Sequence, residues 1–343
     1  QIEDYTTQLA EYLHDRGAIR DPLLAALAEP ALPGSPQARL ALMRDCLRAN
    51  RERMIARFAP YQRLATMADW YEQHPDSLIY ASNQFLADLL VWYHLSWLAE
   101  DTRRRNSRVR HLEDKANGYS VHDRRELLQV ILEEMRSIIP RYRALADSGQ
   151  VELCMSPYAH PIVPLLLDME CAREAMPDAP LPVNTSYPGG AERARWHLQH
   201  GLATFERIFG RRPVGLWPSE GGVSQAALPV FADSGFRWIA SGGSVLNNSH
   251  DAQGKSCSHR VYRFGDAAID CVFRDDGLSD MIGFTYSDWH AEDAVANLIG
   301  HMENIADLCP DRDDCLISII LDGENAWEYY PENGYYFLNH LYK

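Results

Sequence analysis

The chain has 343 residues, of which 46% are hydrophobic and 24% are charged, a composition typical of a globular protein with a sizeable core. Asp and Glu outnumber Lys and Arg by 48 to 33, which gives a formal net charge of −15 and makes nucleic acid an unfavourable partner. The dense basic stretch at 103–110 is expected to be a solvated helix end or loop.

The cysteines and the apolar runs indicate the compartment. The seven cysteines are odd in number and form no C-x-x-C pair, so neither a disulfide framework nor a structural zinc site is expected. We expect reduced thiols in a cytoplasmic protein. The longest apolar run, 85–98, contains Asp88 and His94 and is too short and polar to span a membrane. The chain begins at Gln1 without Met and stops at Lys343 inside a helix-like run, so we expect an internal piece of a longer protein.

Residues 1–148 have a helical pattern. In 85–98 apolar residues cover nearly all faces of the expected helix, which is typical of a buried helix. Ser120 followed by Asp123 resembles the start of a helix. Pro140 is expected to kink or end that helix, because proline removes a backbone donor.

From residue 150 onwards, short β-rich runs alternate with helical stretches. This alternation predicts parallel strands joined by crossover helices, as in a barrel or an open doubly wound sheet. In both architectures the reacting groups lie at the carboxyl ends of the strands. The expected strands are 150–155, 213–217, 236–241, 268–274 and 316–321, and the expected helices are 162–174, 190–209, 223–234 and 291–307.

Polar residues follow four of these strands and predict a cleft. Glu220 stands between a Pro-Ser pair and two glycines, a turn with room for a ligand. On local pattern alone, Glu220 also fits a surface position near a helix start. Asp275 likewise fits an ordinary Asp-Asp-Gly turn, and His160 fits a hydrogen-bonded structural histidine. The polar clusters are Ser156, Tyr158 and His160; Ser219 and Glu220; Arg274, Asp275 and Asp276; and Asp322, Glu324 and Asn325.

Four motifs together resemble glycoside hydrolase family 57. They are G-Q-V-E-L-C-M-S-P-Y-A-H-P-I, G-L-W-P-S-E, F-R-D-x-x-L-S-D-x-I-G-F and D-G-E-N-A-W-E, and they cover residues 149–328 in the family's order. The motifs of serine hydrolases, zinc proteases, P-loop proteins and dinucleotide-binding proteins are absent from the sequence.

The resemblance implies an α/β fold, an incomplete seven-stranded (β/α) barrel of TIM-like type. Residues 1–148 would form a helical segment inserted in or flanking the barrel, and residues 149–343 would supply the barrel strands and the catalytic cleft. The family's first motif, His-Gln-Pro, is absent, and five strands are expected here rather than seven. We therefore expect the barrel to be truncated at the N-terminus of this chain.

The resemblance also implies a retaining glycoside hydrolase or transglycosylase that acts without a cofactor on α-glucans of the starch or glycogen type. Amylase, pullulanase and 4-α-glucanotransferase activities, on α-1,4 and α-1,6 bonds, all fit. Glu220 matches the nucleophile, and Asp275 is assigned as acid/base, with Asp276 and Asp280 as alternatives in a shifted register. Residues matching positions that line the sugar cleft are His160, Trp217, Asp280, Asp322, Glu324 and Trp327.

Two other functions compete with this interpretation. The first is a metal-dependent carbohydrate enzyme on a related barrel, a deacetylase or an α-mannosidase, with His160 and either Asp275 or Asp322 as ligands. The second is a glucan-binding protein without turnover, although both catalytic-type carboxylates are present.

Overall fold

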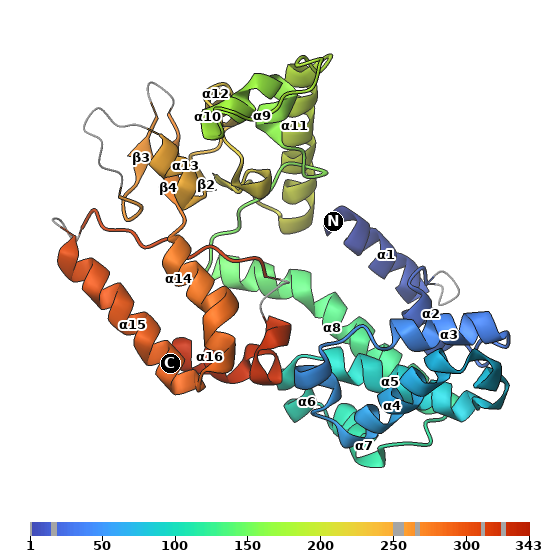
Figure 1. The fold of residues 1–343 in the computed structure, drawn as a ribbon. Helices are drawn as coiled ribbons and strands as arrows, with labels where there is room; N and C mark the ends of the chain where they lie inside the picture. Colours follow the sequence, from blue (N-terminus) through green and yellow to red (C-terminus); the bar gives the residue numbers. More distant parts are fainter. Residues whose placement is uncertain (1, 15–18, 250–256, 265–267, 310–312, 324–326) are drawn as a thin grey trace. The chain divides into compact units, whose positions relative to one another are not determined.

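The fold is described from a computed structural model, which divides the chain into two compact units (Figure 1). The structure describes residues 2–14, 19–249, 257–264, 268–309, 313–323 and 327–343. The first unit comprises residues 1–138, 286–292 and 323–343, and the second comprises residues 139–285 and 293–322.

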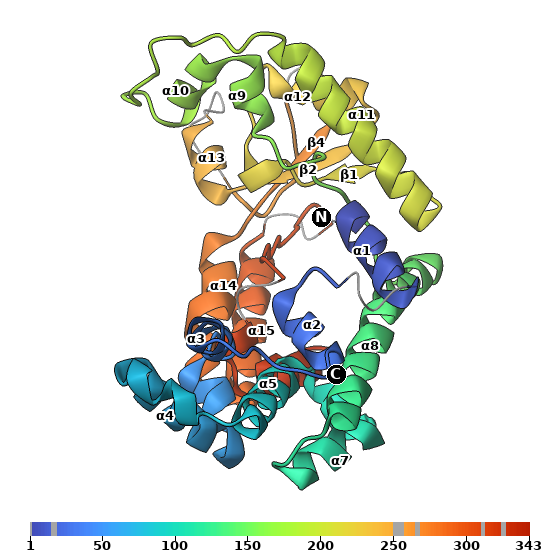
Figure 2. The same cartoon turned by 90° about the vertical axis from the view of Figure 1, so that its right-hand side faces the viewer.

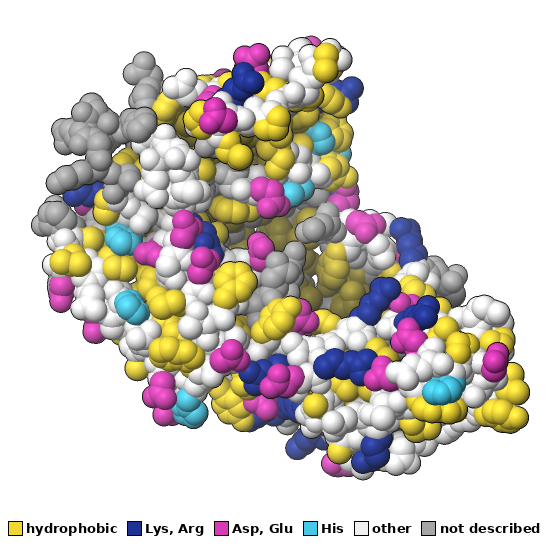
Figure 3. All heavy atoms as spheres, viewed as in Figure 1, with side chains coloured by type: hydrophobic (Ala, Val, Ile, Leu, Met, Phe, Trp, Pro, Cys, Tyr) yellow, Lys and Arg dark blue, Asp and Glu magenta, His cyan; other side chains and the backbone are white. Residues whose placement is uncertain are grey.

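The first unit is built of helices. Helix α8 begins in this unit and continues into the second. The helices are α1 (Ile2–His14), α2 (Pro22–Ala28), α3 (Pro36–Asp45), α4 (Ala59–Gln73), α5 (Asn83–Trp97), α6 (Glu100–Arg105), α7 (Ser107–Lys115), α8 (Val121–Asp147) and α16 (Tyr335–Leu341). Figure 3 shows basic and acidic side chains interspersed over this unit. Arg51 and Asp69 form one ion pair within the unit.

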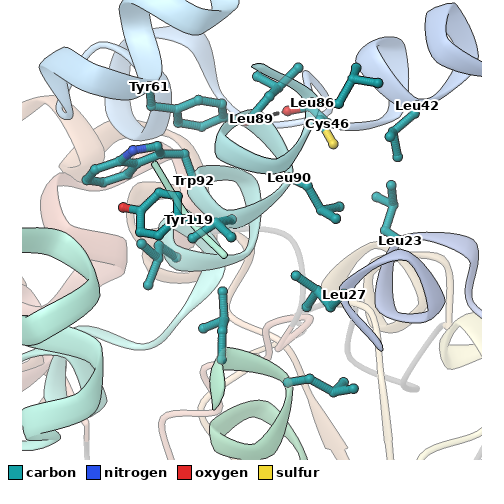
Figure 4. Packing of buried hydrophobic residues seen from close by; sticks show 14 of the residues in the cluster. Leu23, Leu27, Leu42, Cys46, Tyr61, Leu86, Leu89, Leu90, Trp92 and Tyr119 are labelled. Carbon is teal, nitrogen blue, oxygen red and sulfur yellow. Dashed lines mark hydrogen bonds between the residues drawn. The ribbon is translucent and has the colours of Figure 1, made fainter. Parts of the chain in front are cut away.

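Helix α5 forms the centre of the first core, and its predicted burial is confirmed (Figure 4). Leu89 and Leu90 are fully buried, and the rings of Tyr61 and Trp92 belong to the same cluster. The buried Asp88 carboxylate accepts the backbone N–H groups of residues 118 and 119. A charged group inside this core is therefore compensated by backbone donors.

Three further predictions concern this unit. The helix start is confirmed, because the Ser120 hydroxyl accepts the Asp123 N–H while the Asp123 carboxylate accepts the Ser120 N–H. Helix α8 does not end at Pro140 but continues to Asp147. The expected solvation of the basic stretch is wrong at Arg103, which is buried. Its guanidinium lies over the Phe58 ring, 4.2 Å from the ring centroid, and pairs with Glu100 and Glu113.

The buried imidazole of His94 makes the stability of the protein depend on pH. Burial lowers the pKa of His94 to about 4, and the hydrogen bond between Nδ1 and the Leu90 carbonyl offsets only part of that effect. The unfolded chain takes up this proton near pH 6.5, whereas the folded chain resists it. The free energy of unfolding should therefore fall by about 3 kcal/mol between pH 6.5 and pH 4.

Denaturant titrations across this pH range test the effect. His94→Leu should remove most of this pH dependence, since the folded state then excludes no proton. His111 is exposed on α7, so His111→Leu serves as the matched control and should keep the wild-type dependence. A His94→Leu profile parallel to that of the wild type would contradict the assignment.

The second unit contains a small mixed sheet with helices packed against it. Helices α9, α11 and α12 lie beside one another next to the sheet (Figure 2). The helices of this unit are α9 (Val163–Leu167), α10 (Ala172–Ala175), α11 (Gly190–Phe209), α12 (Ala227–Asp233), α13 (Gly243–Asn248), α14 (Asp276–Asp280) and most of α15 (Ala291–Leu308). The strands are β1 (Gly215–Leu216), β2 (Trp238–Ser241), β3 (Tyr262–Arg263) and β4 (Asp270–Phe273), in the order β1-β2-β4-β3.

The predicted parallel pairing is confirmed for this sheet. Strands β1, β2 and β4 are parallel neighbours, and β3 pairs antiparallel with β4. Met155 forms a parallel bridge with Leu216, and Ser318 forms one with Arg274. All five expected strand regions thus lie side by side in chain order, although the first and last contribute single bridges rather than full strands. The seven-stranded barrel stays a prediction.

One prediction about the cysteines is wrong. Cys309 and Cys315 form a disulfide, whereas the sequence pattern indicates reduced thiols. The pair is only six residues apart, at the end of α15 and at the start of the segment that leads to Ser318. Pairing across so short a stretch depends on local backbone geometry, which a count of cysteines does not contain.

Within the part of the chain that the structure describes, none of the helices combines the length and the hydropathy that a membrane span requires.

Candidate active site

Glu220 occupies a tight turn after β1. Its backbone is left-handed, with φ 56° and ψ 23°, which costs a non-glycine residue about 1–2 kcal/mol. The Ser241 hydroxyl donates a hydrogen bond of 2.6 Å to the Gly221 carbonyl and ties the turn to the end of β2. The Glu220 side chain is 76% exposed. The turn therefore fixes the backbone while it leaves the carboxylate open to solvent.

His160 is held beside the Glu220 carboxylate. Its Nε2 lies 3.0 Å from Glu220 Oε1, although the two residues are 60 positions apart. Ala159 and His160 both have φ 57°, a second left-handed stretch in non-glycine residues. The pairing follows from the sheet, because the Met155 bridge and β1 are parallel neighbours whose carboxyl ends meet. Two predicted site residues are therefore together.

The Asp275 carboxylate has a partner on each oxygen. Oδ1 accepts the Leu278 N–H at 2.8 Å and caps the N-terminus of α14. Oδ2 lies 2.8 Å from Nε2 of His259, and the Asp275 side chain is only 14% exposed. The Asp275 N–H donates to the Ser318 carbonyl. Asp275 is thus fixed in position and largely shielded from solvent.

Arg274 neutralises the two other carboxylates of this motif. Its guanidinium donates to Asp276 at 2.8 Å and to Asp280 at 2.7 Å. Nε of Arg274 also donates to the Ile320 carbonyl, in the segment that precedes Asp322. Burial lowers the pKa of Arg274, but the hydrogen bonds to the two aspartates outweigh that effect and raise it. Both partner carboxylates therefore face a permanent positive charge.

Close contacts at three glycines pack the turn that carries Glu220 and the turn that carries Asp275 against the end of β2. A Cβ on Gly221 would lie 3.5 Å from the Gly242 nitrogen. A Cβ on Gly243 would lie 2.7 Å from Asp276 Oδ2 and 2.8 Å from the Arg274 carbonyl oxygen. The turn after β1 and the turn after β4 are thus both packed against residues 241–243. The structure brings these two turns to one edge of the sheet.

Trp217 and Asp322 also follow parallel segments of this sheet. Trp217 is half-buried, and its ring lies 3.2 Å from the Cβ position of Gly221. Asp322 is exposed, two residues beyond the Ile320 backbone that binds Arg274 and the Ser279 hydroxyl.

The last motif divides between the two units. Glu324 lies outside the described residues. Trp327 belongs to the first unit, where its ring centroid lies 5.4 Å from that of Tyr330 and 6.3 Å from that of Phe337. Its predicted role in a sugar cleft stays a prediction.

The residues that form this edge lie within a match to a known family. The sequence profile of glycosyl hydrolase family 57 matches residues 53–343, most of the chain. The chain belongs to glycosyl hydrolase family 57. No curated protein sequence matches it.

Solved structures similar to this family 57 chain include two branching enzymes and an amylase. The branching enzymes, from Thermococcus kodakaraensis and Pyrococcus horikoshii, share 13% and 14% identity with TM-scores of 0.48. The α-amylase from Thermotoga maritima shares 12% identity with a TM-score of 0.47. The alignments cover 91%, 91% and 93% of this chain but 64%, 63% and 65% of those structures, so the chain spans less than two thirds of their length.

The sequence did not point to one residue that the structure places in this candidate site. His259 precedes the antiparallel strand β3 and reaches Asp275 because β3 lies beside β4. A lone histidine in S-H-R gives no motif, and β3 was not among the expected strands. Among the described residues, no three His, Cys, Asp or Glu side chains form a group able to hold a metal ion.

The two glycines after β2 form a matched pair for testing the packing of this edge. Gly243→Ala places a methyl group against a backbone carbonyl that cannot move aside, so it should lower the free energy of unfolding by about 1–3 kcal/mol. Gly242 has φ −74° and ψ 149°, and a Cβ there meets nothing closer than 3.7 Å. Gly242→Ala should therefore stay within about 0.5 kcal/mol of wild type in a urea titration. Equal losses in the two variants would contradict the close packing of Gly243.

Proposed function

We propose that this chain carries the reacting groups of a retaining α-glucan hydrolase or transglycosylase. One observation supports this most directly. The exposed Glu220 carboxylate is held in a left-handed turn, paired with His160, and shares a sheet edge with Asp275 and Asp322. Membership of family 57 makes a sugar substrate the natural interpretation of that arrangement.

Glu220 is the proposed nucleophile. Its carboxylate attacks the anomeric carbon while a second carboxylic acid protonates the departing glycosidic oxygen, which leaves a covalent glycosyl-enzyme. Water then hydrolyses this intermediate, or a sugar hydroxyl takes over the glycosyl group, with the second residue acting as base. Because His160 bonds only one oxygen of Glu220, it orients the carboxylate and leaves Oε2 for attack. Retention requires the two carboxyl groups to stand about 5–5.5 Å apart.

The proton donor has two candidates. Asp275 is the one assigned from the sequence motif, and the contact with His259 offers a route for its proton. However, both of its oxygens are already engaged, Oδ1 by the Leu278 N–H and Oδ2 by the His259 imidazole. Asp322 is exposed at the end of the adjacent segment. These contacts favour Asp322 as donor and Asp275 as a residue that positions the edge.

The parallel segments from Met155 to Ser318 are, in this proposal, part of the incomplete barrel that the sequence motifs imply. The substrate is an α-glucan of the starch or glycogen type. Both α-1,4 hydrolysis and glucanotransfer use the same glycosyl-enzyme, so the two activities require no difference in Glu220.

Replacing the nucleophile tests the central assignment. Glu220→Gln should lower kcat on maltooligosaccharides at least about 10³-fold, because amide nitrogen and oxygen cannot form the glycosyl-enzyme. Glucan binding should persist. Glu206 is exposed on α11, and Glu206→Gln is the matched control. The measurement is product formation by the full-length protein on maltoheptaose. A Glu220→Gln variant with most of the wild-type rate would rule out this mechanism.

A comparison of leaving groups separates the two donor candidates. Loss of a general acid typically costs about 10²–10⁴-fold when the leaving oxygen is strongly basic. The cost is small for a nitrophenyl glucoside, whose phenolate leaves without a proton. Asp322→Asn should therefore slow maltooligosaccharide cleavage far more than nitrophenyl maltooligoside cleavage. Asp275→Asn, which keeps a helix-capping side chain, should slow both substrates by similar factors. If instead Asp275→Asn slowed maltooligosaccharide cleavage far more than nitrophenyl maltooligoside cleavage, and Asp322→Asn slowed both equally, Asp275 would be the donor.

A further inference from the structure

Helix α11 packs unusually close to the loop that carries His160. A Cβ on Gly201 would lie 3.3 Å from the Tyr158 nitrogen, a tight contact with the loop backbone, and 2.5 Å from Cε at the movable end of the Met155 side chain. The Tyr158 N–H donates to the His197 carbonyl at 3.2 Å, and Nδ1 of His197 lies 2.6 Å from the Tyr158 carbonyl oxygen. The backbone N–H and the carbonyl oxygen of Tyr158 therefore both bind His197 and hold the loop against the helix.

Four rings gather where α11 meets this loop, those of Tyr158, Trp196, His197 and His200. We call Tyr158, Trp196 and His200 the α11 ring cluster. The Trp196 indole stacks on the His200 imidazole, with centroids 4.9 Å apart and planes inclined by 13°. The Tyr158 ring stands edge-on to both, at 5.8 Å from Trp196 and 4.3 Å from His200. These contacts from two chain segments fix the orientation of the indole.

The Trp196 indole does not belong to the hydrophobic core that α11 packs against. The buried face of α11 consists of other residues, among them Ala194, Leu198 and Leu202. Trp196 lies off that face and is 51% exposed. An indole that is held by neighbouring rings and half exposed to solvent offers a flat apolar surface, with the stacked His200 imidazole and the edge-on Tyr158 ring beside it. That combination suits a pyranose ring, which has an apolar face and a rim of hydroxyl groups.

The cluster is continuous with the candidate site. Tyr158 and His160 are two residues apart, so their Cα atoms are at most about 7 Å from each other. His160 contacts Glu220 directly. A glucan of several units that reacts at Glu220 therefore has the α11 ring cluster within reach of its outer residues.

We propose that the α11 ring cluster is a second sugar-binding position, at which Trp196 stacks on one glucose unit of an α-linked gluco-oligosaccharide bound at Glu220. This inference rests on the proposed function and extends it to a preference for long substrates. Stacking at a distance from the reacting bond contributes equally to the bound substrate and the transition state, so its loss affects affinity.

Calorimetric titration with maltotriose and maltoheptaose tests this position. All proteins carry Glu220→Gln, so that no ligand is turned over. The parent should bind maltoheptaose more tightly than maltotriose. Trp196→Ala should weaken maltoheptaose binding about tenfold, which corresponds to about 1.4 kcal/mol. The ratio of the two affinities should shrink accordingly. Trp196→Phe, which keeps a smaller ring, should recover part of the loss.

Trp70 provides a matched control. It is 48% exposed on α4 and stacks on His74, four residues later, at 4.4 Å and 16°. It thus repeats the Trp196–His200 geometry in the first unit, on a helix other than α11. Trp70→Ala should leave both affinities unchanged.

The outcomes separate the two proposals. Unchanged maltoheptaose affinity in Trp196→Ala, or an equal loss in Trp70→Ala, overturns the ring-cluster position while the proposed function stands. A parent that binds neither oligosaccharide overturns both. Thermal unfolding of each variant shows whether it is folded. If Trp196→Ala is misfolded, the ratio of maltoheptaose to maltotriose affinity in Trp196→Phe tests the ring-cluster position instead.

Discussion

Parallel pairing of β1, β2 and β4 is the constraint on which the candidate site depends. Parallel neighbours deliver their carboxyl ends to one edge, and here β1 and β4 are each followed by a turn that carries acidic groups, with the glycines after β2 between them. The strands are short, so their backbone hydrogen bonds alone do not hold the turns in place, and contacts of the residues at the end of β2 contribute as well. The Ser241 hydroxyl and the glycines at 242 and 243 pack the neighbouring turns against β2. Without this register, Glu220 and Asp275 would remain separate surface residues.

The acidic residues on this edge differ because their partners differ. Glu220 has one imidazole contact and is otherwise solvated, whereas Asp275 is shielded and uses both oxygens. Asp276 and Asp280 share the guanidinium of Arg274. Carboxylates of one chemical type therefore have unequal access to a substrate.

The sequence predicted the part of this arrangement that depends on periodicity and strand order. Helix α11 was expected at 190–209 and begins and ends there, because its apolar spacing and flanking glycines are strong local patterns. The presence of His160 and Glu220 on one edge was expected from their strand ends, whereas their direct contact comes from the structure. The contact between His259 and Asp275 could not be predicted, since it depends on a two-residue antiparallel strand. Nor could the burial of Arg103, which depends on Phe58 and two acidic partners contributed by other turns of the chain.

Gly190 and Gly201 lie eleven residues apart, three turns along the same face of α11. At the first, an added Cβ would collide with the Leu166 backbone, and at the second with Met155. The backbone of α11 therefore lies directly against α9 at Gly190 and against the segment that leads to His160 at Gly201. A larger side chain at either glycine would push one of these segments away from the helix, so the position of His160 depends on residues of α11 that do not touch it.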